Sequence, residues 1–241
     1  MIRKVITVTP CYAPAAMFAA SRSRIPWADG LVAEKWVLLN KYPLPSVEAN
    51  EAAVVEIAAT YGYRTFDSGD DLGLHGSLNN FFAHNPQPPG TILIDVDPDS
   101  GCDTPGWDAA ICEVMEADPS LAIVALGIPE TASAPWRKIG GHRVFVHPSM
   151  MMFNVCGIDL DFINGTCGGF SQPVKYWGGL EGGFYEPMKA AGRSLAYLMD
   201  HVNIDYSLRD THDPRYAAWK WEHFYGRFPG SFAEYIERAL A

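Results

Sequence analysis

The stretch Thr91–Gly101, TILIDVDPDSG, joins an apolar run to an acidic loop. Thr91–Val96 is rich in aliphatic and β-branched residues, which predicts a buried strand. Carboxylates stand at alternate positions from its end onward, as Asp95, Asp97 and Asp99. Crowded carboxylates repel one another, and a hard cation such as Mg²⁺, Mn²⁺ or Ca²⁺ relieves that repulsion. The end of this strand is therefore a candidate metal site.

Strand and helix patterns alternate in the residues before this stretch. Besides Thr91–Val96, the predicted strands are Lys4–Thr9, Lys35–Asn40 and Tyr63–Phe66. Helical periodicity lies between them, at Val54–Tyr61 and near Leu74–Phe82. This alternation indicates an α/β fold, with a mainly parallel sheet and helices on both faces. Ligands bind beyond the carboxyl ends of such strands, where Asp95–Asp99 fall.

The second half of the chain has a less regular pattern. Thr104 as a cap and Pro105 at the first position predict a helix start, and Leu121–Leu126 and Val144–His147 read as strands. Ser231 and Glu234 form a capping box that opens a C-terminal helix. The Gly-rich residues 157–183 show no clear element.

Composition narrows the class of protein. The chain has 241 residues, of which 48% are hydrophobic, and this is enough for a folded globule with a packed core. Its formal net charge of -10 argues against a broad phosphate-binding surface. No apolar stretch reaches the roughly 18 residues of a membrane span, and no signal peptide is evident, so we expect a cytoplasmic protein. The five cysteines form no CxxC pair, which favours buried free thiols.

The acidic stretch has two simpler interpretations than a catalytic metal site. A solvated acidic turn that caps a helix is the commonest use of such a short pattern. A calcium loop of the EF-hand type fails on spacing, because Ser100 stands where its glycine belongs and Gly106 where its bidentate Glu belongs.

Several segments together resemble the glycosyltransferase family two proteins of the GT-A fold. The similar segments are Val5–Tyr12, Trp36–Asn40, Asp71–Asn79 and Thr91–Asp97, in the order and spacing of that family. The resemblance implies a single GT-A-type domain over residues 1–241, with a Rossmann-like sheet. Residues 1–101 would be its nucleotide-sugar-binding half, and residues 102–241 a mixed half that carries the acceptor site and the catalytic group.

The resemblance also assigns donor and metal roles. Asp95 would face the ribose, or the metal through water, and Asp97 would bind Mn²⁺ or Mg²⁺ directly. Asn40 stands where the family commonly has an Asp that contacts the base, and Leu78 stands where an Arg is customary. With Asp95, the residues implied in nucleotide binding are Pro10, Tyr12, Asn40 and Asn79.

Two further roles come from the second half of the family pattern. Inverting members carry a catalytic base eleven residues before a helix-ending Gly, and this spacing from Gly192 leads to Glu181. A carboxylate there accepts the proton of an acceptor hydroxyl. A loop His completes the metal or diphosphate site in the family; His212 is the first choice here and His223 the second.

The resemblance thus implies a metal-dependent hexosyl- or pentosyltransferase that uses a nucleoside-diphosphate sugar, with UDP-sugars weakly favoured. The acceptor would be a saccharide or a hydroxymethylated DNA base, and the net charge of -10 disfavours the DNA base. A sugar-phosphate nucleotidyltransferase is the nearest rival, although residues 10–14 lack the Gly and Lys that its first loop usually carries. A non-catalytic carbohydrate- or calcium-binding module is the rival of another class.

Overall fold

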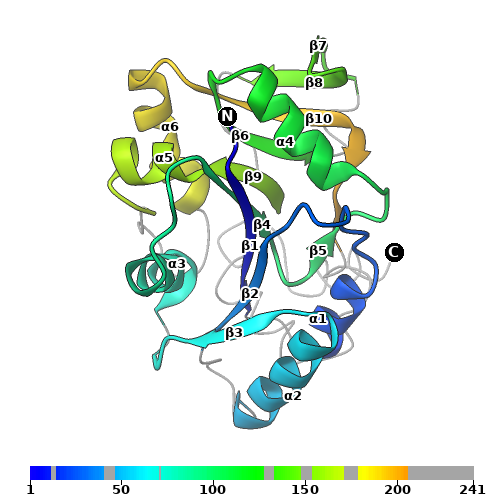
Figure 1. The fold of residues 1–241 in the computed structure, drawn as a ribbon, viewed down its shortest axis with the longest axis vertical. Coiled ribbons are helices and arrows are strands. Elements are labelled where there is room, and N and C mark those ends of the chain that lie inside the picture. The colour runs from blue at the N-terminus through cyan, green and yellow to red at the C-terminus, as the bar shows by residue number, and fades with distance from the viewer. Residues whose placement is uncertain are drawn as a thin grey trace, which may run out of the picture.

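The structure is a computed structural model, and it describes residues 1–11, 15–40, 47–70, 72–127, 133–147, 154–170 and 179–205. These residues form a nine-stranded sheet in the order β3-β2-β1-β4-β9-β6-β10-β8-β7, and a two-stranded sheet of β11 and β5 (Figure 1). The fold is mixed α/β, as the sequence predicts.

The first half of the sheet is entirely parallel. β1 pairs with both β2 and β4, and β2 pairs with β3, all in the same direction. Their bounds are β1 (Lys4–Cys11), β2 (Glu34–Leu39), β3 (Arg64–Asp67) and β4 (Thr91–Val96). All four predicted strands are confirmed. β4 is buried along its whole length and β1 along most of it, whereas β3, at one end of the strand order, is only partly covered.

Helices alternate with these strands. They are α1 (Ala15–Arg22), α2 (Val47–Thr60) and α3 (Gly73–His84). The last two confirm the predicted helical patterns, and Gly62 follows α2 with a φ of 74°. α1 was not predicted from the sequence. Its buried face includes Ser21 and Arg22, so counting apolar residues alone hides its period.

The second half of the sheet is mixed. β9 (Val155–Asp159) lies antiparallel between β4 and β6 (Leu121–Gly127), and β10 (Ser194–Val202) runs parallel to β6. β8 (His142–His147) is antiparallel to β10 and to the edge strand β7 (Arg137–Ile139). The strands at 121–126 and 144–147 are confirmed, whereas β9 and β10 were not predicted.

The helices of the second half correct one expectation. α4 (Trp107–Ala117) begins after Gly106, which has a φ of 83°, so the predicted start with Thr104 as cap is wrong. α6 (Gly179–Ala190) begins within the Gly-rich residues 157–183, for which the sequence showed no clear element. α5 (Leu160–Phe162) leads directly into a π-helical turn, Ile163–Cys167. The capping box at Ser231 lies outside the described residues.

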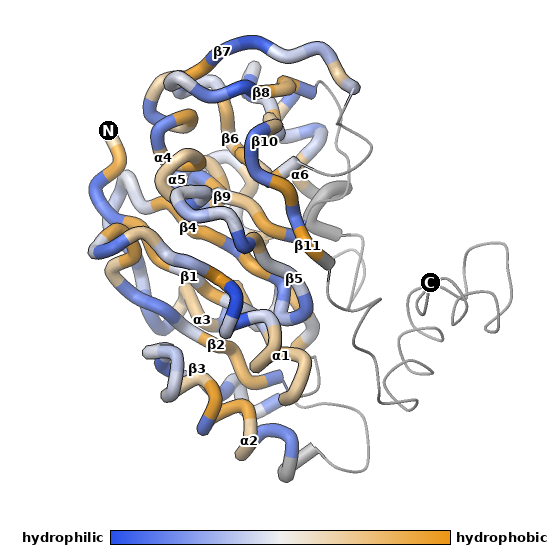
Figure 2. The backbone as a smooth tube through the Cα atoms, turned by 90° about the vertical axis from the view of Figure 1, so that its right-hand side faces the viewer, coloured by the Kyte–Doolittle hydropathy of each residue, from blue (hydrophilic) through white to orange (hydrophobic). Residues whose placement is uncertain are grey.

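The helices cover both faces of the sheet. In Figure 1, α3, α5 and α6 lie on one side, and α4 with α1 and α2 lies on the other. The first side packs Leu78, Phe81, Phe162 and Phe184 on the strands, and the second side packs Trp107 and Ile111 of α4. In Figure 2, hydrophobic (orange) segments lie along the strands in the middle of the molecule. Within the described part of the chain, no helix is long and apolar enough to cross a membrane.

Candidate active site at the carboxyl edge of the parallel strands

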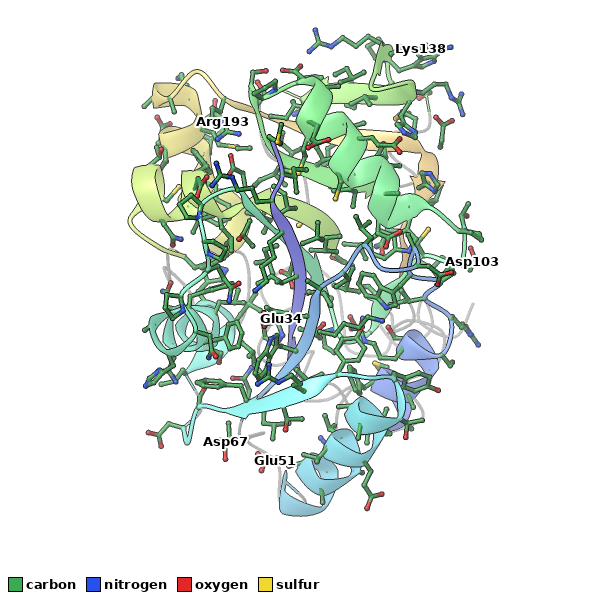
Figure 3. The ribbon with its side chains drawn as sticks, in the orientation of Figure 1. Glu34, Glu51, Asp67, Asp103, Lys138 and Arg193 are labelled. Carbon is green, nitrogen blue, oxygen red and sulfur yellow. The ribbon has the colours of Figure 1, made fainter. Side chains whose placement is uncertain are left out.

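The parallel strands bring several predicted site residues to one edge of the sheet. β1, β2, β3 and β4 end at Cys11, Leu39, Asp67 and Val96 (Figures 1 and 3). Parallel strands have their carboxyl ends on the same side of the sheet, which we call its carboxyl edge. Four predicted site residues therefore gather there: Pro10, Asn40, Asp95 and Asp97. Tyr12, which follows β1, lies outside the described residues.

Asp95 is a buried carboxylate within β4. It is 4% exposed, and its register partners are Val8 on β1 and Cys156 on β9. Its Oδ1 has no hydrogen-bond partner among the described residues. Burial raises the pKa of Asp95 to about 7, while the charge of Arg22 and the backbone N–H of Val96 act in the opposite direction. A buried carboxylate of this kind gains from a nearby cation.

Asp97 is partly exposed and its backbone is held from two sides. Its N–H donates to the carbonyl oxygen of Asn154 (2.9 Å), and its own carbonyl oxygen accepts from the N–H of Ser100 (3.1 Å). The same carbonyl oxygen accepts from Nη2 of Arg22 at 2.8 Å. Sequence reasoning missed Arg22, because it lies 75 residues away on a helix that was not predicted.

Asn40 is buried directly after β2, with an exposed fraction of 2%. Its Oδ1 contacts Oγ of Ser77, and the same Oγ lies 2.7 Å from the carbonyl oxygen of Gly73 on α3. Its Nδ2 has no hydrogen-bond partner among the described residues. Pro10 is also buried, opposite Leu38 of β2. Both residues line the same edge as Asp95, and their contact with a nucleotide stays a prediction.

Asn79 uses both ends of its side-chain amide within the protein. Nδ2 donates to the carbonyl oxygen of Phe170 at 2.8 Å, and Oδ1 accepts from the N–H of Phe170 at 2.9 Å. The backbone comes close here, since a Cβ at Gly169 would lie 3.1 Å from Oδ1. Asn79 therefore ties α3 to the chain after the π-helical turn, and nucleotide binding by Asn79 stays a prediction.

Glu181 lies in the first turn of α6. The glycine eleven residues later does end the helix: α6 stops at Ala190, and Gly192 has a φ of 65°. Arg193 follows and forms an ion pair of 2.7 Å with Asp159, near the amino ends of the parallel strands and away from their carboxyl ends (Figure 3). The role of Glu181 as base stays a prediction.

His212 lies outside the described residues, but the chain before it is placed. β11 (Ile204–Asp205) pairs antiparallel with β5 (Ser100–Gly101), directly after the acidic loop. Figure 2 shows the two short strands side by side. The chain at Asp205, seven residues before His212, therefore lies next to Ser100.

The described residues supply only part of a metal site. They contain no group of three or more His, Cys, Asp or Glu side chains that could hold a metal ion together. Asp97 and Asp95 offer the hard oxygen donors that Mn²⁺ and Mg²⁺ prefer. The remaining ligands of such an ion would have to come from a bound diphosphate, from water or from other parts of the chain.

Comparison with known proteins identifies the fold. No protein-family profile and no curated protein sequence matches the chain. Among solved structures, a mannosyltransferase from Pyrobaculum calidifontis in complex with GDP-Man and Mn²⁺ matches with a TM-score of 0.62 and 12% identity, over 99% of this chain and 73% of that chain. GalNAc-T7 with UDP, GalNAc and Mn²⁺ matches with a TM-score of 0.63 and 11% identity.

The match to GalNAc-T7 covers 99% of this chain but 54% of that protein, so this chain spans about half its length. A glucosyl-3-phosphoglycerate synthase from Mycobacterium tuberculosis, in complex with Mn²⁺, UDP and glucosyl-3-phosphoglycerate, matches with a TM-score of 0.54 and 13% identity, over 84% and 72% of the two chains. At these identities the shared feature is the fold. The chain therefore has the GT-A-type fold of glycosyltransferases.

Proposed function

We propose that this protein is a metal-dependent glycosyltransferase, which moves a sugar from a nucleoside-diphosphate sugar to an acceptor hydroxyl. The observation that carries this proposal is the pair Asp95 and Asp97 at the carboxyl edge of four parallel strands. The similar solved structures contain Mn²⁺ with UDP or with GDP-Man, which supports the same chemistry at this edge.

Asp97 would hold Mn²⁺ or Mg²⁺, because it is the more exposed of the two acids. The bound cation would act as a Lewis acid on the diphosphate and offset the charge of the departing nucleotide. Asp95 would face the ribose, or the cation through water. His212 would complete the site, and the pairing of β5 with β11 supports this by starting the C-terminal segment beside the acidic loop.

The nucleoside would lie over the ends of β1 and β2. Pro10, Tyr12, Asn40 and Asn79 are the residues that we propose to surround it. Asn40 supports this position, because its buried Nδ2 has no partner among the described residues and can donate to a base oxygen. We propose a UDP-sugar as the first donor to test.

Glu181 would accept the proton of the acceptor hydroxyl as that oxygen attacks the sugar carbon, so the anomeric configuration would invert. Its place near the amino end of α6 suits an ionised carboxylate, because the helix dipole favours negative charge there. We propose a saccharide as acceptor in preference to a hydroxymethylated DNA base, since the net charge of -10 opposes binding to a polyanion.

A panel of thermal unfolding measurements tests the donor site. UDP, GDP, UDP-glucose and GDP-mannose are each added with Mn²⁺ and with EDTA. We expect at least one nucleotide to raise the unfolding temperature only with Mn²⁺, because binding to the native state stabilises it. Asp97→Asn should abolish this rise and leave the unfolding temperature without metal unchanged or higher. Asp103→Asn removes an equal charge from an exposed nearby site and is the matched control.

The product separates the candidate activities. A glycosyltransferase releases the nucleoside diphosphate from a nucleotide sugar. A nucleotidyltransferase instead transfers the nucleoside monophosphate group of the nucleotide sugar to pyrophosphate, which gives a nucleoside triphosphate and releases the sugar phosphate. A non-catalytic module does neither. Absence of any metal-dependent nucleotide binding by the wild-type protein would refute the proposal.

A further inference from the structure

The last turn of α1 is bonded to the backbone of the acidic loop. Oγ of Ser21 donates to the carbonyl oxygen of Ser100 at 2.5 Å. Nη2 of Arg22 donates to the carbonyl oxygens of Val96, at 3.2 Å, and of Asp97, at 2.8 Å. Two consecutive residues of one helix thus reach three carbonyl groups in and beside the loop.

Arg22 is itself restrained. Its side chain is 3% exposed, and its guanidinium carbon lies 5.1 Å from the ring centre of Phe18 and 5.8 Å from that of Tyr63. Packing against two rings limits the positions of the guanidinium group. Its charge also acts on the buried carboxylate of Asp95. Both hydrogen bonds come from one nitrogen, Nη2, while Nε and Nη1 have no hydrogen-bond partner among the described residues. The rigid plane of the guanidinium group fixes the directions of the two Nη2 hydrogens, whereas a lysine ammonium rotates about its own bond.

These hydrogen bonds fix the backbone of Asp97, and so the position from which its side chain extends. Its N–H is bonded to Asn154 and its carbonyl oxygen to Ser100 and Arg22. We infer that Arg22 is a positioning residue, which holds the Asp97 backbone so that its carboxylate meets the metal–diphosphate group in a set geometry. Ser21 supports the far end of the same loop. This inference rests on the proposed function only for the identity of the bound group.

Two measurements on the full chain test the inference. The first is Mn²⁺ affinity in the presence of UDP, read from the electron paramagnetic resonance signal of free Mn²⁺. The second is amide hydrogen exchange of residues 96–101 without metal. Arg22→Lys keeps the charge but replaces the rigid Nη2 donor by a flexible ammonium, and Ser21→Ala removes the hydrogen bond to the carbonyl oxygen of Ser100. Arg24→Lys makes the same change at an exposed site two residues away and is the control.

We expect Arg22→Lys to weaken Mn²⁺ affinity by about tenfold, the range seen when a group that orients a metal ligand is lost. Exchange at residues 96–101 should become faster in Arg22→Lys and in Ser21→Ala, while Arg24→Lys should match the wild type in both measurements. A lowered unfolding temperature with unchanged Mn²⁺ affinity and unchanged loop exchange would overturn the inference. If Arg22→Lys does not fold, Arg22→Gln, which is shorter and uncharged, takes its place, and wild-type Mn²⁺ affinity in that variant overturns the inference.

The two proposals fail in different ways. If the wild-type protein binds Mn²⁺ with none of the four nucleotides of the panel but the loop exchanges faster in the variants, the proposed function is wrong and the positioning contact stands. If the wild type binds Mn²⁺ with UDP and Arg22→Lys binds it equally well, the positioning role is wrong and the proposed function stands.

Discussion

Nη2 of Arg22 donates a hydrogen bond of 2.8 Å to the carbonyl oxygen of Asp97, across 75 residues of sequence. This contact joins α1 to the end of β4, the strand that pairs with β1 on one side and with β9 on the other. The candidate metal ligand is therefore held by parts of the chain that are distant from it in sequence. The predictions below test the site and the packing behind it.

Glu181→Gln should spare donor binding and reduce transfer by about 10²- to 10⁴-fold, because a glutamine cannot accept the proton of the acceptor hydroxyl. Transfer is measured as release of the nucleoside diphosphate with acceptor present, and donor binding is measured by thermal shift. Glu186→Gln, a neutralisation in the same helix, is the control. If Glu181→Gln lowers donor affinity and leaves the turnover number intact, Glu181 is not the base.

The pH dependence of stability reports on Asp95. Its pKa rises from 3.8 to about 7, first because the carboxyl is buried. The native state then binds more protons than the unfolded state between these values, so stability without metal should fall as the pH rises through this window. In Asp95→Asn this fall should be smaller. Unfolding temperatures in EDTA from pH 4 to 8 check this, and parallel curves for the two proteins would contradict it.

Mn²⁺ affinity should rise over the same pH window, because a protonated Asp95 does not attract a cation. Wild type and Asp95→Asn are compared by titration with Mn²⁺ in the presence of UDP, and Asp103→Asn serves as the charge control. The pH dependence should be weaker in Asp95→Asn than in the other two proteins. An equal slope in all three would show that Asp95 does not titrate at the metal site.

Asn79→Ala should lower the free energy of unfolding by about 1–2 kcal/mol, because two hydrogen bonds to the Phe170 backbone are lost. Asn80→Ala, at the next position of α3, is the comparison. Chemical denaturation gives both values. If Asn79→Ala keeps full stability but loses nucleotide affinity, the amide serves the nucleotide rather than the fold.

Gly157→Ala tests the packing of the inserted strand. A Cβ there would lie 2.3 Å from Cγ2 of Ile111 and 3.2 Å from Sδ of Met115. Relieving this overlap should cost about 1–3 kcal/mol of stability. A Cβ at Gly165 would meet nothing within 4 Å, so Gly165→Ala is the matched control. Equal unfolding free energies for the two variants would mean that β9 does not pack on α4 as described.

Much of the first half follows from local sequence. The strands predicted at 4–9, 35–40, 63–66 and 91–96 each form a parallel strand, and the most apolar of them, β4, is buried along its whole length. β9 was missed because Val155–Asp159 is brief, contains Gly157 and adjoins a Gly-rich region, which reads as a loop. The predicted start of α4 was wrong, since Gly106 adopts a left-handed conformation and the helix begins after it.

Part of the candidate site likewise follows from the local sequence, and part of it depends on the tertiary structure. The sequence by itself determined that Asp95 and Asp97 follow a buried strand at a ligand-binding edge, because strand periodicity and the ends of parallel strands are local properties. Only the tertiary structure decided that β9 lies between β4 and β6, and that Arg22 and Asn154 hold the backbone of Asp97. The physical reason is that a local pattern specifies which side of an element is buried, whereas the partner against which it packs depends on residues far away in the chain.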